Sequence, residues 1–265
     1  KKYLKNDFFS SFMLFNSSLI KNNINESRKY LRILESIPKA KYISKRGKVI
    51  LLFKEKKNKE LKDSLVEFCK EYPKDIWFHE KLSKIYVIEN DWKMAHDTIE
   101  SFTNIPEDLK DYFANLKILS GEKVIDAYRL SSSSICVVNE TIKFYIEQGN
   151  IKKAAEIIDK NWKYLLCFEL IESFMIHKIT NEKEKLKRCK IINKILKKYI
   201  NEDSNETKFS MAYASFEASI WGEAQNYLDQ IKQDKWDERV INLYEKINIK
   251  TKKTKSIFLN INILP

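Results

Sequence analysis

Small and large apolar residues alternate along this chain at helical spacing. In three places an alanine precedes a large aliphatic residue by four positions, namely Ala95 and Ile99, Ala154 and Ile158, and Ala224 and Leu228. An offset of four residues places both members of such a pair on one face of a helix. A small side chain at this position lets a second helix approach closely, so the pattern predicts helices that pack in pairs.

The helix pairs recur at a nearly constant interval. The segment Leu82-Ser83-x-x-Tyr86, followed by Ala95, Phe102 and Pro106, fits the tetratricopeptide (TPR) pattern, whose period is about 34 residues. Second helices of successive units are expected to begin at Asn25, Asn58, Asp91, Glu122, Asn150 and Trp221. The long gap before Trp221 leaves room for two units, one of them degenerate.

Proline positions and the scarcity of turn residues support the same architecture. Pro38, Pro73 and Pro106 fall where units should end, because proline cannot continue a helix interior. With only 4 glycines and 4 prolines in 265 residues, the chain lacks the turns that a strand-rich protein needs. The sequence therefore predicts an all-α TPR-type solenoid, a right-handed superhelix of about seven antiparallel helix pairs over residues 1–250. Residues 251–265 are basic and then apolar, and are expected to form a flexible tail.

The charge balance is basic, with 49 Lys and Arg against 37 Asp and Glu and a formal net charge of +12. Such an excess can indicate binding to nucleic acid or to an anionic membrane surface. The lysines are spread along the chain, and aromatic residues are not interleaved with arginines as in single-strand binders. We therefore expect no nucleic-acid partner, and an adaptor driven by charge is the weakest alternative.

No catalytic or metal-binding motif is recognisable. The phosphate-binding, dinucleotide-binding and serine-hydrolase glycine patterns are missing, and the four cysteines do not have zinc-site spacing. The apolar runs 12–15 and 49–53 are far shorter than the about 20 residues of a membrane span. These observations favour a binding module without catalytic activity, metal or cofactor.

One stretch resembles the HemY family of bacterial TPR proteins. Residues 149–163 (GNIKKAAEIIDKNWK) are similar to that family's turn, K-A-A core, aliphatic pair and W-K, and residues 211–228 resemble its A-x-A and W-G-x-A elements. The motifs at Tyr72-Pro73-x-x-x-Trp77 and Asn90-Asp91-Trp92 fit the same family. The similarity covers residues 72–228, and one departure is Gln225, where the family has arginine.

The resemblance implies a scaffold that binds partner proteins in connection with late haem biosynthesis. It also implies attachment to the bacterial inner membrane through an N-terminal anchor that this sequence does not contain, with the soluble part in the cytoplasm. Two alternatives stay open, which are a haem or porphyrin carrier and a generic TPR interaction module of another pathway. In the carrier alternative, His79 or His177 would coordinate the haem iron.

The TPR frame also predicts which side chains face a partner. In TPR stacks the first helix of each unit lines the concave groove, and mixed aromatic and charged groups there can hold a helix or an extended peptide. The frame assigns to that groove Arg46, Trp77, Glu80, Lys84, Asn139, Lys143, Phe209 and Tyr213.

Overall fold

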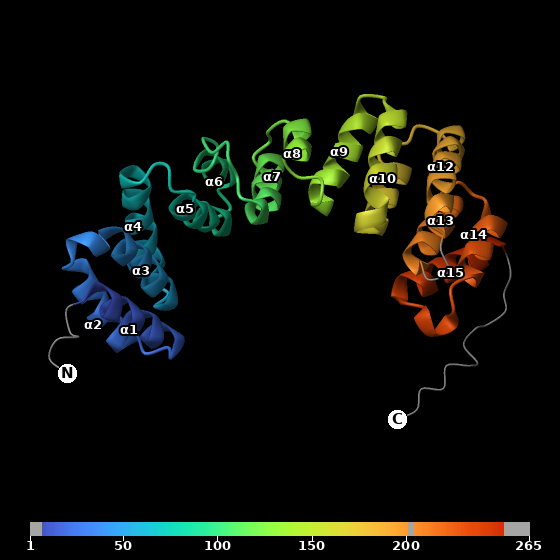
Figure 1. Ribbon diagram of the computed structural model, residues 1–265. Coiled ribbons are helices and arrows are strands. Elements are labelled where there is room, and N and C mark those ends of the chain that lie inside the picture. The colour runs from blue at the N-terminus through green and yellow to red at the C-terminus, as the bar shows by residue number, and fades with distance from the viewer. Residues whose placement is uncertain (1–6, 201–203, 252–265) are drawn as a thin grey trace. The chain divides into compact units, whose positions relative to one another are not determined.

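The computed structural model describes residues 7–200 and 204–251, and within these ranges every regular element is a helix (Figure 1). This confirms the predicted all-α fold. In the described residues, no helix combines the length and the apolar character that crossing a bilayer requires.

The chain forms two compact units, Lys1–Pro106 (unit 1) and Glu107–Pro265 (unit 2). The helices of unit 1 are α1 (Phe8–Ile20), α2 (Ile24–Glu35), η1 (Pro38–Ala40), α3 (Lys41–Lys54), α4 (Asn58–Glu71), α5 (Ile76–Ile88) and α6 (Trp92–Asp97). The helices of unit 2 are η2 (Glu107–Leu109), α7 (Lys110–Leu119), α8 (Val124–Leu130), α9 (Ile135–Glu147), α10 (Ile151–Leu165), α11 (Phe168–Ile176), α12 (Glu182–Leu196), η3 (Lys197–Tyr199), α13 (Asn205–Glu217), α14 (Trp221–Asp229), η4 (Gln233–Lys235) and α15 (Glu238–Thr251).

Consecutive helices pack as pairs from α1 with α2 to α13 with α14, and α15 packs against the last pair. The connections within the pairs are short, which makes the two helices of each pair antiparallel. The pair α11 and α12 occupies the long gap before Trp221 that the sequence left for a degenerate unit. The superhelical hand and the single solenoid over residues 1–250 stay predictions.

Helix starts follow local capping chemistry. Asp91 and Asn150 cap α6 and α10 as their side chains suggest, accepting hydrogen bonds from the backbone N–H groups of Met94 and Lys153, each at 3.0 Å. The expected start at Asn25 is displaced, because Asn23 is the residue that caps α2. Likewise, the start expected at Glu122 moves to Val124.

The predicted small residues lie where helices meet. Ala95, Ala154 and Ala224 are completely buried. Their aliphatic partners Ile99, Ile158 and Leu228 are also buried, so the alanine pattern correctly located the packed face of the second helices.

Enlarging one of these alanines should destabilise the protein. Ala154→Leu forces three extra carbon atoms into a completely buried helix contact, and we expect a loss of about 1–3 kcal/mol in the free energy of unfolding. Ala95→Leu in unit 1 should behave in the same way. Chemical unfolding measures both losses, and variants as stable as the parent would show that the alanine faces are misassigned.

Every pair contains one residue in the left-handed backbone conformation at the turn between its two helices. Among the described residues, these positions are Asn22, Lys56, Asn90, Gly121, Gly149, Lys178 and Ser219, with φ between 47° and 82°. In six of the seven turns, the next residue donates its N–H to the carbonyl five positions earlier, for example Lys57 to Leu52 at 3.1 Å. This bond is typical of a Schellman cap, which satisfies carbonyls at the helix end.

The turn at Lys56 is a site where the protein can be stabilised. Lys56 is exposed and has φ 57°, a conformation that costs an L-residue about 1–2 kcal/mol, whereas glycine adopts it freely. After the entropy cost of glycine in the unfolded chain, Lys56→Gly should raise the free energy of unfolding by about 0.5–1 kcal/mol. Chemical unfolding of this variant, beside Lys190→Gly in the middle of α12, provides the comparison. Lys190→Gly should lower stability, and equal losses in both variants would contradict the strain argument.

The predicted tail lies almost wholly outside the described residues. Thr251 is the last residue of α15, and residues 252–265 are not described.

Candidate partner-binding groove

The strongest candidate site is a groove of about 390 Å³ on the surface of unit 1. Three consecutive helices form it, and we call it the Trp77 groove. Its lining consists of Val49, Ile50 and Phe53 from α3, Leu61 and Leu65 from α4, and Trp77, Lys81, Lys84, Ile85 and Ile88 from α5.

Helical spacing explains how α5 contributes two different faces. Trp77, Lys81, Lys84 and Ile88 follow one another at intervals of three or four residues, so they share one side of the helix and line the groove. Phe78 and Leu82 fall on the adjoining side, where they are buried in the core of unit 1. The core therefore fixes the rotation of α5 about its axis, and with it the position of the groove residues.

The groove presents large apolar side chains to solvent. Phe53 is 70% exposed, Ile88 is 78% exposed and Ile50 is 37% exposed. Single exposed apolar residues are ordinary on protein surfaces, but apolar residues gathered in one hollow mark a binding surface. Leu61 and Leu65, which are buried, provide the apolar floor beneath them.

Two cationic side chains contact the Trp77 ring. The guanidinium carbon of Arg46, on α3, lies 4.3 Å from the centroid of the Trp77 ring, and the ammonium nitrogen of Lys81 lies 5.6 Å from it. Both distances are within the range of a cation–π interaction. Arg46 also donates a hydrogen bond of 3.3 Å to the Tyr42 hydroxyl, which orients the guanidinium along α3. The half-buried indole is thus a rigid feature of the groove wall.

Glu80 forms ion pairs with both lysines of the groove. Its side chain is 6% exposed and forms ion pairs with Lys81 at 2.8 Å and with Lys84. Burial acts to raise the pKa of Glu80, but its hydrogen bonds and charge interactions with the two ammonium groups outweigh burial and leave the pKa below its usual value. The carboxylate therefore stays ionised and positions both lysines at the groove.

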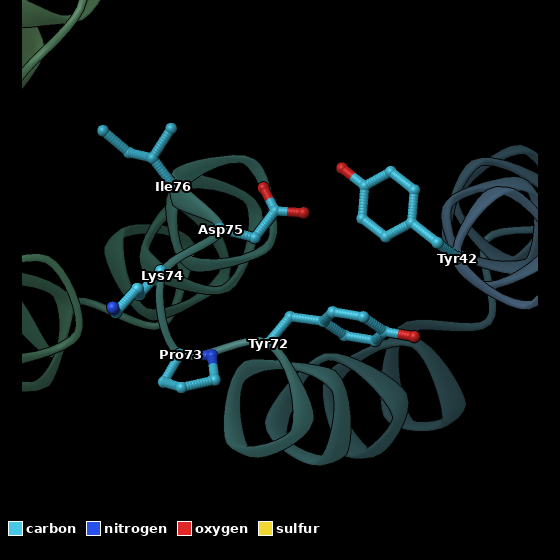
Figure 2. A pocket seen from close by; sticks show the side chains of 6 residues that line it. All are labelled: Tyr42, Tyr72, Pro73, Lys74, Asp75 and Ile76. Atoms are coloured by element: carbon cyan, nitrogen blue, oxygen red, sulfur yellow. The ribbon is translucent and has the colours of Figure 1, made fainter.

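A second, more open hollow of about 550 Å³ lies near the N-terminal ends of α3 and α5. Figure 2 shows the Asp75 carboxyl group pointing toward the Tyr42 hydroxyl across this hollow, with the Tyr72 ring beside them. One carboxylate oxygen of Asp75 caps α5 by accepting the Trp77 N–H at 3.0 Å. Burial, and then the nearby Asp75 carboxylate, raise the pKa of Tyr42. The Asp75 side chain in this hollow therefore has a structural role, because it caps the N-terminal end of α5.

Four of the eight predicted groove residues come together in unit 1. Trp77 and Lys84 line the groove itself, Arg46 stacks on Trp77, and the buried Glu80 binds Lys84. Glu80 is thus a positioning residue for the lysines rather than a contact surface.

The other four predicted residues lie in unit 2. Lys143 pairs with Glu140 at 2.7 Å on α9, where the Asn139 side-chain oxygen is buried without a hydrogen-bond partner. Phe209 is only 4% exposed and packs against Phe168, so its side chain is a core element instead of a partner contact.

Tyr213 is half-buried and also packs against Phe168, with ring centroids 4.8 Å apart. Burial raises the pKa of the Tyr213 hydroxyl above its usual value, with smaller contributions from Glu217 and Glu172. Tyr213 is therefore an uncharged phenol at the edge of the unit 2 core.

The two histidines considered as haem ligands, His79 and His177, both contact other residues of the protein. His79 Nδ1 lies 2.9 Å from the Asp75 carbonyl oxygen, and its ring packs against Phe102. His177 Nε2 lies 3.1 Å from a Glu147 carboxylate oxygen. The haem alternative therefore stays a prediction that depends on the sequence resemblance.

A possible metal-ligand group in the described part of the chain combines His96 with Asp97 and Glu100, whose ligand atoms lie within 4.8 Å of one another. His96 is buried, but both carboxylates are exposed. Exposed acidic groups beside one histidine are common on helices, so this group gives no ground for a metal site.

Sequence reasoning missed most of the apolar groove lining. Run 49–53 was considered only as too short for a membrane span, yet three of its five residues line the groove. A signal was available, because Ile50 and Phe53 extend the apolar pattern of α3 beyond the single stripe that its core contacts need.

Comparison with known proteins shows a likeness to a solved structure. No protein-family model matches the sequence, and no curated protein matches it. Among solved structures, the chain is similar to the crystal structure of the P58(IPK) TPR domain, with 13% sequence identity and a TM-score of 0.31. The match covers 95% of this chain and 81% of that one.

Proposed function

We propose that this protein is a non-enzymatic interaction module that holds an apolar segment of a partner protein in the Trp77 groove. The observation that carries the proposal is the gathering of Ile50, Phe53 and Ile88, all exposed, around the half-buried indole of Trp77. Burying these side chains against a partner would remove apolar surface from water at a gain of about 25 cal/mol per Å².

The dimensions of the groove suit a peptide segment. Its α5 wall runs from Trp77 to Ile88, and at a rise of about 1.5 Å per residue this wall is roughly 16–18 Å long. That length matches about three turns of a partner helix. A groove with two helical walls and a helical floor is the usual setting for an amphipathic helix that inserts its apolar face.

Replacing Trp77 with alanine should weaken partner binding strongly. We suggest selecting binders to the full chain from a displayed library of random 16-residue peptides, then measuring affinities by fluorescence anisotropy. A central aromatic anchor typically contributes about 2 kcal/mol or more, so Trp77→Ala should weaken binding by about 30-fold or more. Lys84→Ala, a change at the rim, should have a smaller effect that depends on salt.

Two variants outside the groove serve as controls. Trp92→Ala removes another half-buried indole, at the start of α6, and Lys57→Ala removes a lysine from the turn before α4. Both should leave peptide affinity within about twofold, as expected for changes remote from a hot spot. Peptides that lose affinity with Lys57→Ala but tolerate Trp77→Ala would exclude the groove as the binding site.

A narrower proposal comes from the resemblance of residues 72–228 to HemY proteins. In this proposal, the module acts as a scaffold at the bacterial inner membrane, with its soluble part in the cytoplasm, and binds enzymes of late haem biosynthesis. Pairwise affinity measurements with purified enzymes of that pathway test the proposal directly. Binding that Trp77→Ala weakens would support it, whereas no affinity for any of these enzymes would leave only the general module.

A further inference from the structure

The cations around the Trp77 groove indicate what kind of segment it accepts. Three cationic side chains lie at the groove: Lys81 and Lys84 on α5 belong to its lining, and Arg46 on α3 contacts the Trp77 ring. Among the described residues that line the groove, none is a carboxylate. The nearby Glu80 carboxylate is buried and does not belong to the lining, but it pairs with both lysines and offsets part of the positive charge.

The wider surroundings have the same sign. Over the described residues, unit 1 carries 19 Lys and Arg against 14 Asp and Glu, a formal net charge of +5, whereas unit 2 carries 24 against 21, a formal net charge of +3. The unit that contains the groove therefore has the larger excess of positive charge. Such a field attracts partners of opposite charge and raises their rate of association.

The position of the cations relative to the apolar lining is specific. Arg46 precedes Val49 and Ile50 by about one helical turn on α3, and it contacts the Trp77 ring on α5. Lys81 and Lys84 lie between Trp77 and Ile88 along α5. A partner that fills the apolar lining would thus bring its flanking side chains within reach of all three cations.

We propose that the natural occupant is an amphipathic helix of a partner protein, with large apolar residues along one stripe and Asp or Glu on the flanks of that stripe. This inference rests on the proposed function, because it specifies the partner of the same groove. Carboxylates on the flanks would form charge-assisted hydrogen bonds with Arg46 and Lys81 as the apolar stripe excludes water. A helix with lysines on its flanks would meet like charges and be rejected.

Three synthetic peptides test the inference. They share one apolar stripe of Leu and Phe at positions i, i+3, i+4 and i+7, and their flanking positions carry only Glu, only Gln or only Lys. Affinity for the full chain is measured by fluorescence anisotropy at 50 and 200 mM salt. We expect the Glu peptide to bind about tenfold or more tightly than the Lys peptide at 50 mM salt, with a smaller ratio at 200 mM as screening increases.

Variants identify the source of the preference. Combining Arg46→Gln with Lys81→Gln should remove most of the ratio between Glu and Lys peptides, whereas Lys57→Gln outside the groove should preserve it. Trp77→Ala should weaken all three peptides, because it removes the anchor that they share.

The possible failures are distinguishable. Equal binding of the three peptides, or tightest binding of the Lys peptide, would overturn the acidic partner and leave the groove in place. A preference for Glu that survives the double variant would also overturn it, by locating the preference elsewhere. If none of the three peptides binds and the library yields no binder, the proposed function fails together with this inference.

Discussion

Replacing Trp162 with alanine should lower the free energy of unfolding by about 3–5 kcal/mol. The Trp162 side chain is completely buried on α10, within the core that extends from α9 to α15. Its indole N–H donates a hydrogen bond of 3.1 Å to the Thr207 hydroxyl on α13, so it joins two pairs that are far apart in sequence. Alanine would leave a large cavity and remove this bond. Chemical unfolding monitored by circular dichroism measures the loss.

Two further variants separate the contributions at this position. Trp162→Phe keeps most of the aromatic volume but loses the hydrogen bond to Thr207, and should cost about 1–3 kcal/mol. Tyr164→Ala changes an aromatic residue of the same helix that is 79% exposed, and should have an effect within about 0.5 kcal/mol. A Trp162→Ala variant as stable as Tyr164→Ala would mean that α10 and α13 do not pack as described.

Arg188→Ala should be similarly destabilising, by about 3–5 kcal/mol, for an electrostatic reason. Arg188 is 1% exposed, and its Nη1 donates hydrogen bonds to the carbonyl oxygens of Phe174 and His177 at 2.7 and 2.8 Å. These carbonyls lie at the C-terminal end of α11, where they have no partner within the helix. Nη2 also pairs with Glu184. Removing the guanidinium would take this donor away from the buried Phe174 carbonyl and the partly buried His177 carbonyl, and would leave Glu184 with hydrogen bonds from Thr180 alone.

The same residue type on the surface provides the matched control. Arg129 is exposed and pairs with Asp126 three residues earlier at 3.1 Å, so Arg129→Ala should cost at most about 0.5 kcal/mol. Arg188→Lys keeps the charge, but a single ammonium cannot reproduce the planar set of donors, so it should recover only part of the loss. Equal stability of the two alanine variants would contradict a supporting role for Arg188 at the end of α11.

Features with a local physical cause could be predicted from the sequence. Small residues such as Ala95 and Ala154 mark close helix contacts. Asp91 and Asn150 start helices through hydrogen bonds to residues only three positions further along the chain. These interactions are encoded within one or two turns of chain. The positions of the first helices in the repeat followed from these local signals. In the structure, Trp77 and Lys84 line the same groove.

Features that depend on contacts between distant segments could not be predicted. Phe209 was assigned to the groove from its position in the frame, yet packing against Phe168, with ring centroids 5.0 Å apart, takes it into the core. The stacking of Arg46 on Trp77 joins residues 31 positions apart, and no local pattern in either helix indicates it. In the same way, no local pattern indicates that Arg188 binds the carbonyl oxygens at the end of α11.

The turns that contain a left-handed residue also determine where residues can be inserted into the chain. Six of these seven turns close their own helix end through a backbone hydrogen bond, so the geometry of those pairs does not require a particular side chain there. Exposed polar turns such as the one at Lys56 are the sites where inserted sequence is tolerated best. Stacked repeats contact only their neighbours. Turns that do not join groove helices, such as those at Gly149 and Ser219, can therefore be lengthened while the three helices of the groove stay intact.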